Sequence, residues 1–226
     1  MSSRFSRATA ITAAGLLALS LSACTSGSFL GASPLDAATP TTVAQPVATT
    51  TPLVFDSVFT DMGSVHPAVM VSNQLELELD MWTEQKTHEW YTDSEKTFSF
   101  VINVYDLAVP AEASFATKRQ VFMSNLSVKA STTTTSGAVE TPLILDVDPV
   151  AVTLDPEALK SENGLLITSP KGGFQLEGNT IGVLAPDTLG LTLDFAMTIS
   201  TESTSGSGVY MTQVVHQVVP VAIFSR

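Results

Sequence analysis

The sequence predicts an all-β fold, an antiparallel β-sandwich of about ten short strands over residues 53–226. Apolar and polar residues alternate strictly in three long runs, and turn-forming residues separate the other apolar segments. Only 109–117 and 156–160 favour a helical turn, and both are short. Many short strands with few helices are typical of a sandwich or barrel with hairpin or Greek-key connections.

The three alternating runs carry most of this prediction. Their apolar members are Leu75, Leu77, Leu79 and Met81; Phe98, Phe100, Ile102 and Val104; and Leu191, Leu193, Phe195, Met197 and Ile199. The residues between them are mostly polar, and in the first run they are mostly acidic. Because successive side chains of a strand point to opposite faces, each run predicts a strand with one face in the core and the other in solvent.

Shorter apolar segments are the remaining strand candidates: 68–72, 121–131, 143–145, 150–154, 165–168, 174–176, 181–184 and 209–219. Turn-forming pairs such as Asp148-Pro149 and Gly178-Asn179 separate them, because Pro fixes φ and Gly permits positive φ. The Ser- and Gly-rich segment 202–208 is expected to join the last two long strands as a hairpin loop.

The number and spacing of the strands favour an immunoglobulin-like sandwich, although the Cys–Trp–Cys pattern of immunoglobulin domains is absent. Residues 53–226 exceed the roughly 100 residues of a minimal sandwich. Two arrangements stay open: one elaborated sandwich, or two small β domains divided at the Thr-rich segment 131–137. We favour one domain.

Residues 1–23 have the pattern of an export signal. Arg4 and Arg7 give a positive start, and the uncharged run 8–21, rich in Ala and Leu, follows. A membrane-spanning helix needs about 20 consecutive apolar residues, and polar residues interrupt this run earlier. We therefore expect a cleaved signal peptide and general secretion.

The run ends in Leu21-Ser22-Ala23-Cys24, which holds the only cysteine of the chain. This tetrapeptide resembles the lipobox of bacterial lipoproteins. The resemblance implies that the Cys24 thiol takes a diacylglyceryl group, that a peptidase cuts before Cys24, and that the lipid anchors the mature protein in a cell membrane outside the cytoplasm. Two or more acyl chains hold a protein on a membrane durably, since each buried methylene contributes about 0.8 kcal/mol. The alternative is an ordinary signal peptide and a free thiol.

Residues 24–52 form the predicted tether. After Cys24 they are almost all Ser, Thr, Ala, Gly, Pro and Val. Such a composition buries too little apolar surface to offset the entropy of the chain, so it is typical of disorder. We expect an extended, Pro-stiffened spacer between the lipid and the folded domain.

Charge and cysteine content exclude several partners. The formal net charge is −12, and it becomes −14 when Arg4 and Arg7 leave with the signal peptide. Nucleic acids and anionic lipid surfaces attract clustered Lys and Arg, so we expect no nucleic acid partner and no membrane contact except through the lipid on Cys24. A single cysteine excludes an intramolecular disulfide and a Cys-based metal site.

The sequence contains no recognisable catalytic or cofactor motif. The patterns GxSxG, GxxxxGK and GxGxxG are absent, and His66, His88 and His216 have no metal-ligand spacing. His66 precedes Pro67 in a predicted loop, and His216 is expected to be a partly buried strand residue. We therefore expect no enzyme activity, no catalytic residues, no metal and no cofactor.

One acidic segment is a weak candidate for calcium. Asp146, Asp148, Asp155 and Glu157 offer oxygen ligands, but the spacing and the glycine of an EF-hand are missing. Acidic loops of this kind are usually solvated surface, so no calcium site is predicted.

The segment 81–91 is the best candidate for a binding surface. It contains Trp82, His88, Trp90 and Tyr91, between two predicted strands. Loops carry binding function on β scaffolds, and exposed Trp and Tyr anchor interfaces. The alternative is that Trp82 and Trp90 cover the edge of the sandwich and close its core.

These observations favour a non-catalytic, lipid-anchored protein of the bacterial cell envelope, whose β-sandwich binds or scaffolds a protein partner. An accessory subunit of a membrane complex fits this description, because a lipid anchor confines the domain near its partner and raises its effective concentration. An adhesin or a module that binds cell wall or glycan is the alternative. A hydrolase or a metal carrier is a third and weaker hypothesis.

Overall fold

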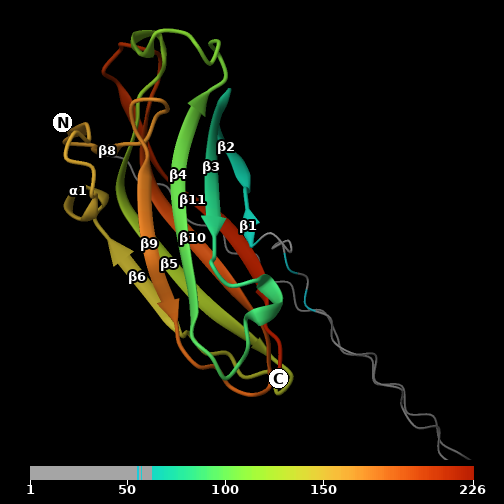
Figure 1. Cartoon of the computed structure of the whole chain (residues 1–226). Coiled ribbons are helices and arrows are strands. Elements are labelled where there is room, and N and C mark those ends of the chain that lie inside the picture. Colours follow the sequence, from blue (N-terminus) through green and yellow to red (C-terminus); the bar gives the residue numbers. More distant parts are fainter. Residues whose placement is uncertain (1–54, 56, 58–62) are drawn as a thin grey trace, which may run out of the picture. The chain divides into compact units, whose positions relative to one another are not determined.

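The computed structural model describes residues 55, 57 and 63–226. The predicted signal peptide 1–23, Cys24 and the predicted tether up to residue 52 lie outside the described residues. The described chain forms two antiparallel sheets that pack face to face, which confirms the predicted all-β sandwich (Figure 1). None of the helices in the described part is long and apolar enough to cross a membrane.

The first sheet, called the β3 sheet, has the order β1-β3-β4-β9, and β2 also pairs with β3. Its strands are β1 (Ser64–Val65), β2 (Ala68–Ser72), β3 (Leu75–Trp82), β4 (Lys96–Asp106) and β9 (Phe174–Ile181). β1 pairs with the end of β3 and β2 with its beginning, so the short connection between them runs alongside β3.

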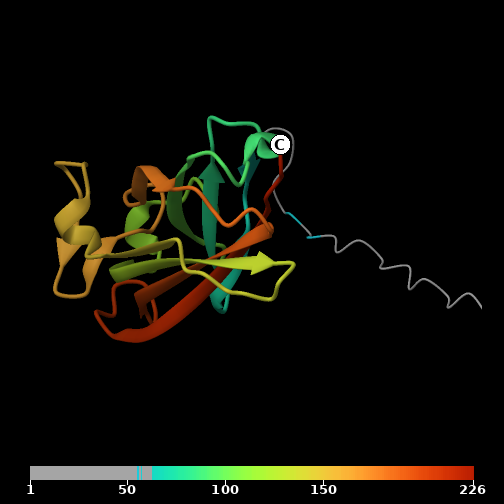
Figure 2. The same cartoon turned by 90° about the horizontal axis from the view of Figure 1, so that it is seen from below.

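The second sheet, called the β10 sheet, has the order β11-β10-β5-β8-β7, and β6 also pairs with β5. Its strands are β5 (Val121–Thr134), β6 (Leu143–Val147), β7 (Lys160–Ser161), β8 (Gly164–Leu166), β10 (Thr188–Glu202) and β11 (Tyr210–Ala222). Figure 2 shows the β3 sheet on one side of the sandwich and the β10 sheet on the other. β11 is thereby an edge strand of its sheet within the described chain.

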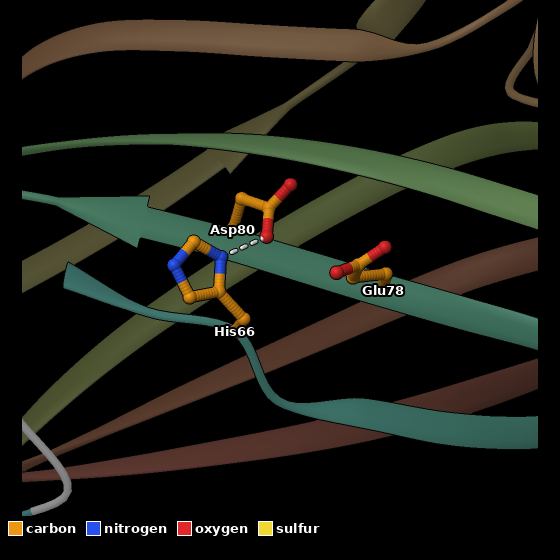
Figure 3. Close-up of side chains that lie close together, drawn as sticks. All are labelled: His66, Glu78 and Asp80. Atoms are coloured by element: carbon orange, nitrogen blue, oxygen red, sulfur yellow. Dashed lines mark hydrogen bonds and ion pairs between the residues drawn. The ribbon is translucent and has the colours of Figure 1, made fainter.

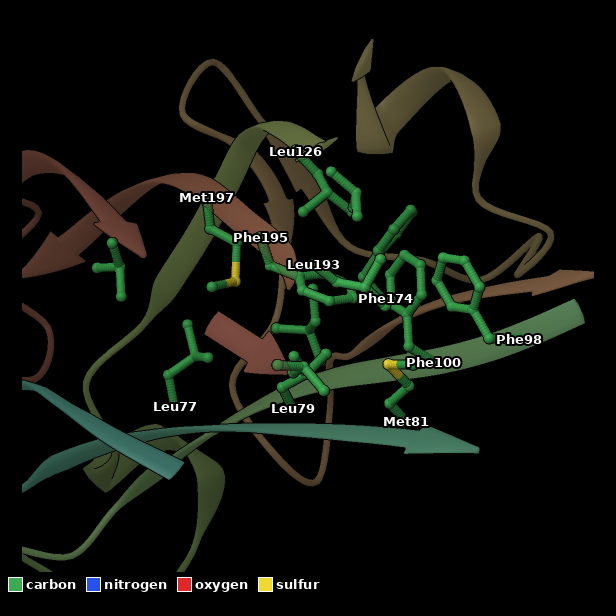
Figure 4. Packing of buried hydrophobic residues seen from close by; sticks show 14 of the residues in the cluster. Leu77, Leu79, Met81, Phe98, Phe100, Leu126, Phe174, Leu193, Phe195 and Met197 are labelled. Atoms are coloured by element: carbon green, nitrogen blue, oxygen red, sulfur yellow. The ribbon is translucent and has the colours of Figure 1, made fainter. Parts of the chain in front are cut away.

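The core lies between the two sheets and consists of the residues that the alternation predicts. Every apolar member of the three alternating runs is fully buried. Side chains of β3 point toward those of β10 (Figure 4). The ring of Phe100 meets that of Phe195 edge-on, with centroids 5.2 Å apart. Burying one such side chain stabilises the fold by about 1.5–3 kcal/mol, so the core joins the two sheets.

A buried ion pair also stabilises the sandwich. Asp106 is the last residue of β4, and its side chain is 2% exposed. Its carboxylate accepts hydrogen bonds from Arg119 Nη2 at 2.6 Å and from Arg119 Nε at 3.1 Å. Arg119 Nη1 reaches the carbonyl of Asn73 at 2.9 Å. The pair thereby ties the turn between β2 and β3 to β4 and to the start of β5.

The predicted strand at 150–154 is wrong, because a helical turn, α1 (Pro149–Val152), occupies this place. Pro149 stands at the first helical position, where its fixed φ is suitable and its missing N–H costs nothing. The Asp148 carboxylate accepts a hydrogen bond from the N–H of Val150 at 2.9 Å and caps the turn. The cap therefore favours a helical turn in a segment whose sequence predicted a strand.

The candidates 174–176 and 181–184 were predicted as two strands, but one strand, β9, runs from Phe174 to Ile181, and residues 182–184 are not in a strand. Gly178 was predicted in a turn and lies instead in a β-bulge: residues 177 and 178 oppose Ser99 alone. The φ of Gly178 is +68°, and glycine adopts this value without strain. The strand therefore continues through the expected turn.

The two short segments expected to favour a helical turn differ in outcome. One turn of 3-10 helix, η2 (Phe115–Thr117), forms within 109–117. No helix forms in 156–160, where the Leu159 carbonyl accepts a hydrogen bond from the N–H of Leu166 and β7 begins at Lys160. The segment 131–137 is the end of β5 and the turn after it. The immunoglobulin-like form of the sandwich stays a prediction.

Candidate functional site

The four residues predicted for binding on the segment 81–91 do not share one surface. Trp90 is fully buried in the core, as expected under the alternative for this residue. Trp82 ends β3 and is half-buried, and His88 is exposed on the 3-10 turn η1 (Thr87–Glu89). Tyr91 is half-buried, and the Arg226 guanidinium lies 4.6 Å from the centroid of its ring. This segment therefore joins the core to the C-terminus of the chain.

A more extended surface lies along β11. This strand is 13 residues long and contains no Lys, Arg, Asp or Glu. Val214 is 57% exposed and Val218 is 49% exposed. Met211 in the strand and Val209 just before it are also exposed. β11 thus presents an uncharged, partly apolar edge on a chain whose net charge is −12.

Neighbouring elements leave most of this edge open within the described chain. The ladder of β11 is made with β10 alone, from Tyr210 to Ala222. Two elements of the other layer approach β11: the 3-10 turn η1, and β2, where Gln213 Nε2 donates a hydrogen bond to the Val71 carbonyl at 2.6 Å. A sheet edge with unpaired backbone N–H and C=O groups is a template for another strand.

His216 also lies on β11, between the two exposed valines. Its imidazole is 56% exposed, not partly buried as expected, and its Nδ1 lies 2.9 Å and 3.2 Å from the two carboxylate oxygens of Asp194 on β10. The prediction that His216 lies in a strand is confirmed, and the predicted partial burial is wrong. The hydrogen-bonded pair of His216 and Asp194 thereby lies beside Val214 and Val218 on the same face of the sheet.

The acidic residues near α1 are engaged separately. Asp146 accepts a hydrogen bond from Asn125 Nδ2, and Asp148 caps α1. Asp155 accepts a hydrogen bond from the N–H of Glu157. In the part of the chain that the structure describes, a different group brings three potential metal ligands together: His66, Glu78 and Asp80.

This group, called the His66 cluster, lies on the outer face of the β3 sheet (Figure 3). Glu78 and Asp80 point outward because they alternate with buried leucines on β3. His66 lies in the connection between β1 and β2, which a hydrogen bond from the N–H of Leu79 to the Pro67 carbonyl holds against β3 at 2.9 Å. The His66 imidazole Nδ1 therefore contacts the Asp80 carboxylate.

The electrostatics of the His66 cluster are those of two carboxylates held close together. Burial raises the pKa of Glu78 above its usual range, and the neighbouring Asp80 carboxylate raises it further, whereas His66 lowers it. Tyr105, on the neighbouring strand β4, lies close enough to both carboxylates for their charges to affect it. Burial raises the pKa of Tyr105, and the negative charges of Glu78 and Asp80 add to this effect. The cluster thus concentrates negative charge beside an imidazole nitrogen.

Sequence reasoning assigned Glu78 and Asp80 to a solvated acidic face and placed His66 in an unrelated loop. The missing information is strand register: Val65 pairs with Met81 and Ala68 with Glu78, so His66 must lie beside Asp80. Metal-ligand spacing along the sequence does not detect this group, because the histidine lies 14 residues from Asp80. An expected hairpin between 68–72 and 75–82 would have been the available signal.

Comparison with known proteins gives no relative: no family model matches the chain, and no curated protein or solved structure is significantly similar to it.

Proposed function

We propose that this chain is a non-catalytic, lipid-anchored protein of the bacterial cell envelope whose β-sandwich binds a protein partner through β11. The observation that carries the proposal is the uncharged, exposed edge of this strand, from Tyr210 to Val219. The occupant is an extended, uncharged strand of another envelope protein. It adds to the β10 sheet by backbone hydrogen bonds, as in β-strand addition generally.

The composition of β11 supports this occupant. Monomeric proteins usually protect edge strands with charged residues, especially Lys, with Pro or with bulges. In β11 the one such residue is Pro220, close to the end of the strand. Val214 and Val218 lie on the same face, four residues apart, and bury apolar surface against β-branched side chains of an added strand. A partner rich in Val, Ile and Thr complements this face best.

The predicted lipid on Cys24 supports a partner in or near the same membrane. Anchoring confines the sandwich to the membrane surface, where the effective concentration of another membrane-bound protein is high. Even a small interface then gives stable association, which fits an accessory subunit of a membrane complex. The adhesin or glycan-binding alternative needs neither β11 nor a second protein.

The test is co-purification of the full-length, lipidated protein from its own cell envelope in mild detergent. Three chains are compared: the wild type, the double variant Val214→Lys/Val218→Lys, and Val183→Lys. Val183 is the matched control, because it is 71% exposed and lies outside β11. We expect a stoichiometric envelope protein with the wild type and with Val183→Lys, and its loss with the double variant.

Other outcomes decide between the alternatives. Retention of the partner by the double variant, or recovery of the protein alone from all samples, contradicts binding through β11. Binding of the purified protein to isolated cell wall without other proteins favours the adhesin. With Cys24→Ala we expect the partner to be reduced, since the sandwich is no longer confined to the membrane.

A further inference from the structure

We propose that His66, Glu78 and Asp80 bind a divalent first-row transition metal ion, with Zn²⁺ as the best-fitting member. The site is separate from β11, because the His66 cluster lies on the outer face of the opposite sheet. Metal binding at the His66 cluster is therefore independent of the proposed partner binding through β11.

The geometry of the ligand atoms supports the proposal. The imidazole nitrogen and one oxygen of each carboxylate all lie within 4.8 Å of one another. Zn²⁺ bonds His nitrogen and carboxylate oxygen at about 2.0–2.2 Å, so two of its ligands lie at most about 4.4 Å apart. A small adjustment of side chains therefore brings all three atoms to bonding distance. His66 is 60% exposed, which leaves an open approach for the ion and for water as the remaining ligand.

The chemistry of the donors selects the class of metal. Calcium takes six to eight oxygen ligands, whereas this cluster offers one nitrogen and two carboxylates. Imidazole with carboxylate suits Zn²⁺ and its first-row neighbours. A divalent ion complements the two carboxyl groups, which lie beside the same imidazole.

Surrounding contacts orient the ligands. Glu78 and Asp80 lie on β3, which pairs with β4 on one side and with β1 and β2 on the other. The Pro67 carbonyl is bonded to the N–H of Leu79, so the backbone on both sides of His66 is fixed by pairing with β3. Strand pairing therefore fixes the backbone positions of all three ligand residues relative to one another.

The experiment is a titration of the full-length, tag-free, chelator-treated protein in mild detergent with Zn²⁺. Calorimetry gives the stoichiometry, and the visible spectrum of the Co²⁺-loaded protein reports the ligands. We expect one ion per chain, and a loss of at least about tenfold in Zn²⁺ affinity for His66→Ala and for Asp80→Asn. His88→Ala and His216→Ala are matched controls and should bind as the wild type does.

Three results would overturn the proposal. They are the absence of Zn²⁺ binding at micromolar concentration, unchanged affinity in His66→Ala, and equal affinity for Ca²⁺ and Zn²⁺. Thermal unfolding separates a folding defect from a lost ligand: apo His66→Ala should melt as the apo wild type does, and Zn²⁺ should raise the melting temperature of the wild type alone.

Discussion

The Asp106 carboxylate and the Arg119 guanidinium form a two-pronged ion pair at the end of β4, with N–O distances of 2.6 Å and 3.1 Å. The same carboxylate also accepts hydrogen bonds from the backbone N–H groups of Ala108 and Arg119. Since the Asp106 side chain is almost fully buried, its charge depends on these four donors. The packing of the sandwich at this point therefore depends on the charge of Asp106.

Asp106→Asn should lower the free energy of unfolding by about 3 kcal/mol. Removing one partner of a buried ion pair leaves the other charge without compensation, here that of Arg119. Urea unfolding at neutral pH measures the change. The exposed pair between Arg226 and Asp93 is the control, and Asp93→Asn should change stability by less than about 1 kcal/mol.

The contribution of Asp106 to the free energy of unfolding should disappear in acid. Burial raises the pKa of Asp106, but the hydrogen bonds from Arg119 and Ala108 outweigh this effect and hold the pKa below 3.8. A carboxyl with a lowered folded-state pKa contributes stability that is complete above the unfolded-state pKa and is lost as the pH falls through the folded-state pKa. The difference in stability between the wild type and Asp106→Asn should shrink below pH 3.8. A constant difference between pH 6 and pH 2.5 would contradict the ion pair.

Trp90→Ala should lower the free energy of unfolding by about 3–5 kcal/mol, because Trp90 is fully buried. Trp82→Ala should cost about 1 kcal/mol or less, since Trp82 is half-buried at the end of β3. Chemical denaturation measures both variants. If the partner binds through β11, Trp82→Ala should retain it. Loss of the partner from Trp82→Ala at unchanged stability would place the binding surface on the segment 81–91.

Gly164→Ala should destabilise the sandwich more than Gly137→Ala does. Both glycines have positive φ, which costs other residues about 1–2 kcal/mol. A Cβ at Gly164 would also lie 2.3 Å from the Met123 carbonyl oxygen, whereas a Cβ at Gly137 meets no atom within 4 Å. The melting temperatures of the two variants separate the effect of the steric clash at Gly164 from the effect of positive φ alone. Equal decreases in melting temperature would contradict the tight pairing of β8 with β5.

Much of the fold was predictable because period-two alternation is a direct consequence of strand geometry. Leu79 and Phe195 are buried as their runs require. The failures came from local chemistry that competes with this pattern. Asp148 and Pro149 start a helical turn where β-branched residues favoured a strand, and Gly178 forms a bulge where a turn was expected.

The candidate sites were less predictable because they depend on pairing between strands. The position of β11 at a sheet edge follows from the order of strands, which alternation does not encode. The same holds for His66: only the pairing register of β1 and β2 with β3 places it beside Asp80. For Trp90 the sequence left two readings open, a binding residue or part of the core, and burial decides for the core.

The most direct test of partner binding through β11 is site-specific photo-crosslinking in living cells. A photoreactive residue is placed at Val214 or Val218 on β11, at the exposed control position Val183, or at Tyr91. We expect crosslinks from 214 and 218 to one envelope protein, and none to that protein from 183 or 91. Crosslinks from 91 alone would contradict β11 as the binding edge, and crosslinks from 214 to a second copy of this chain would contradict a different protein as its occupant.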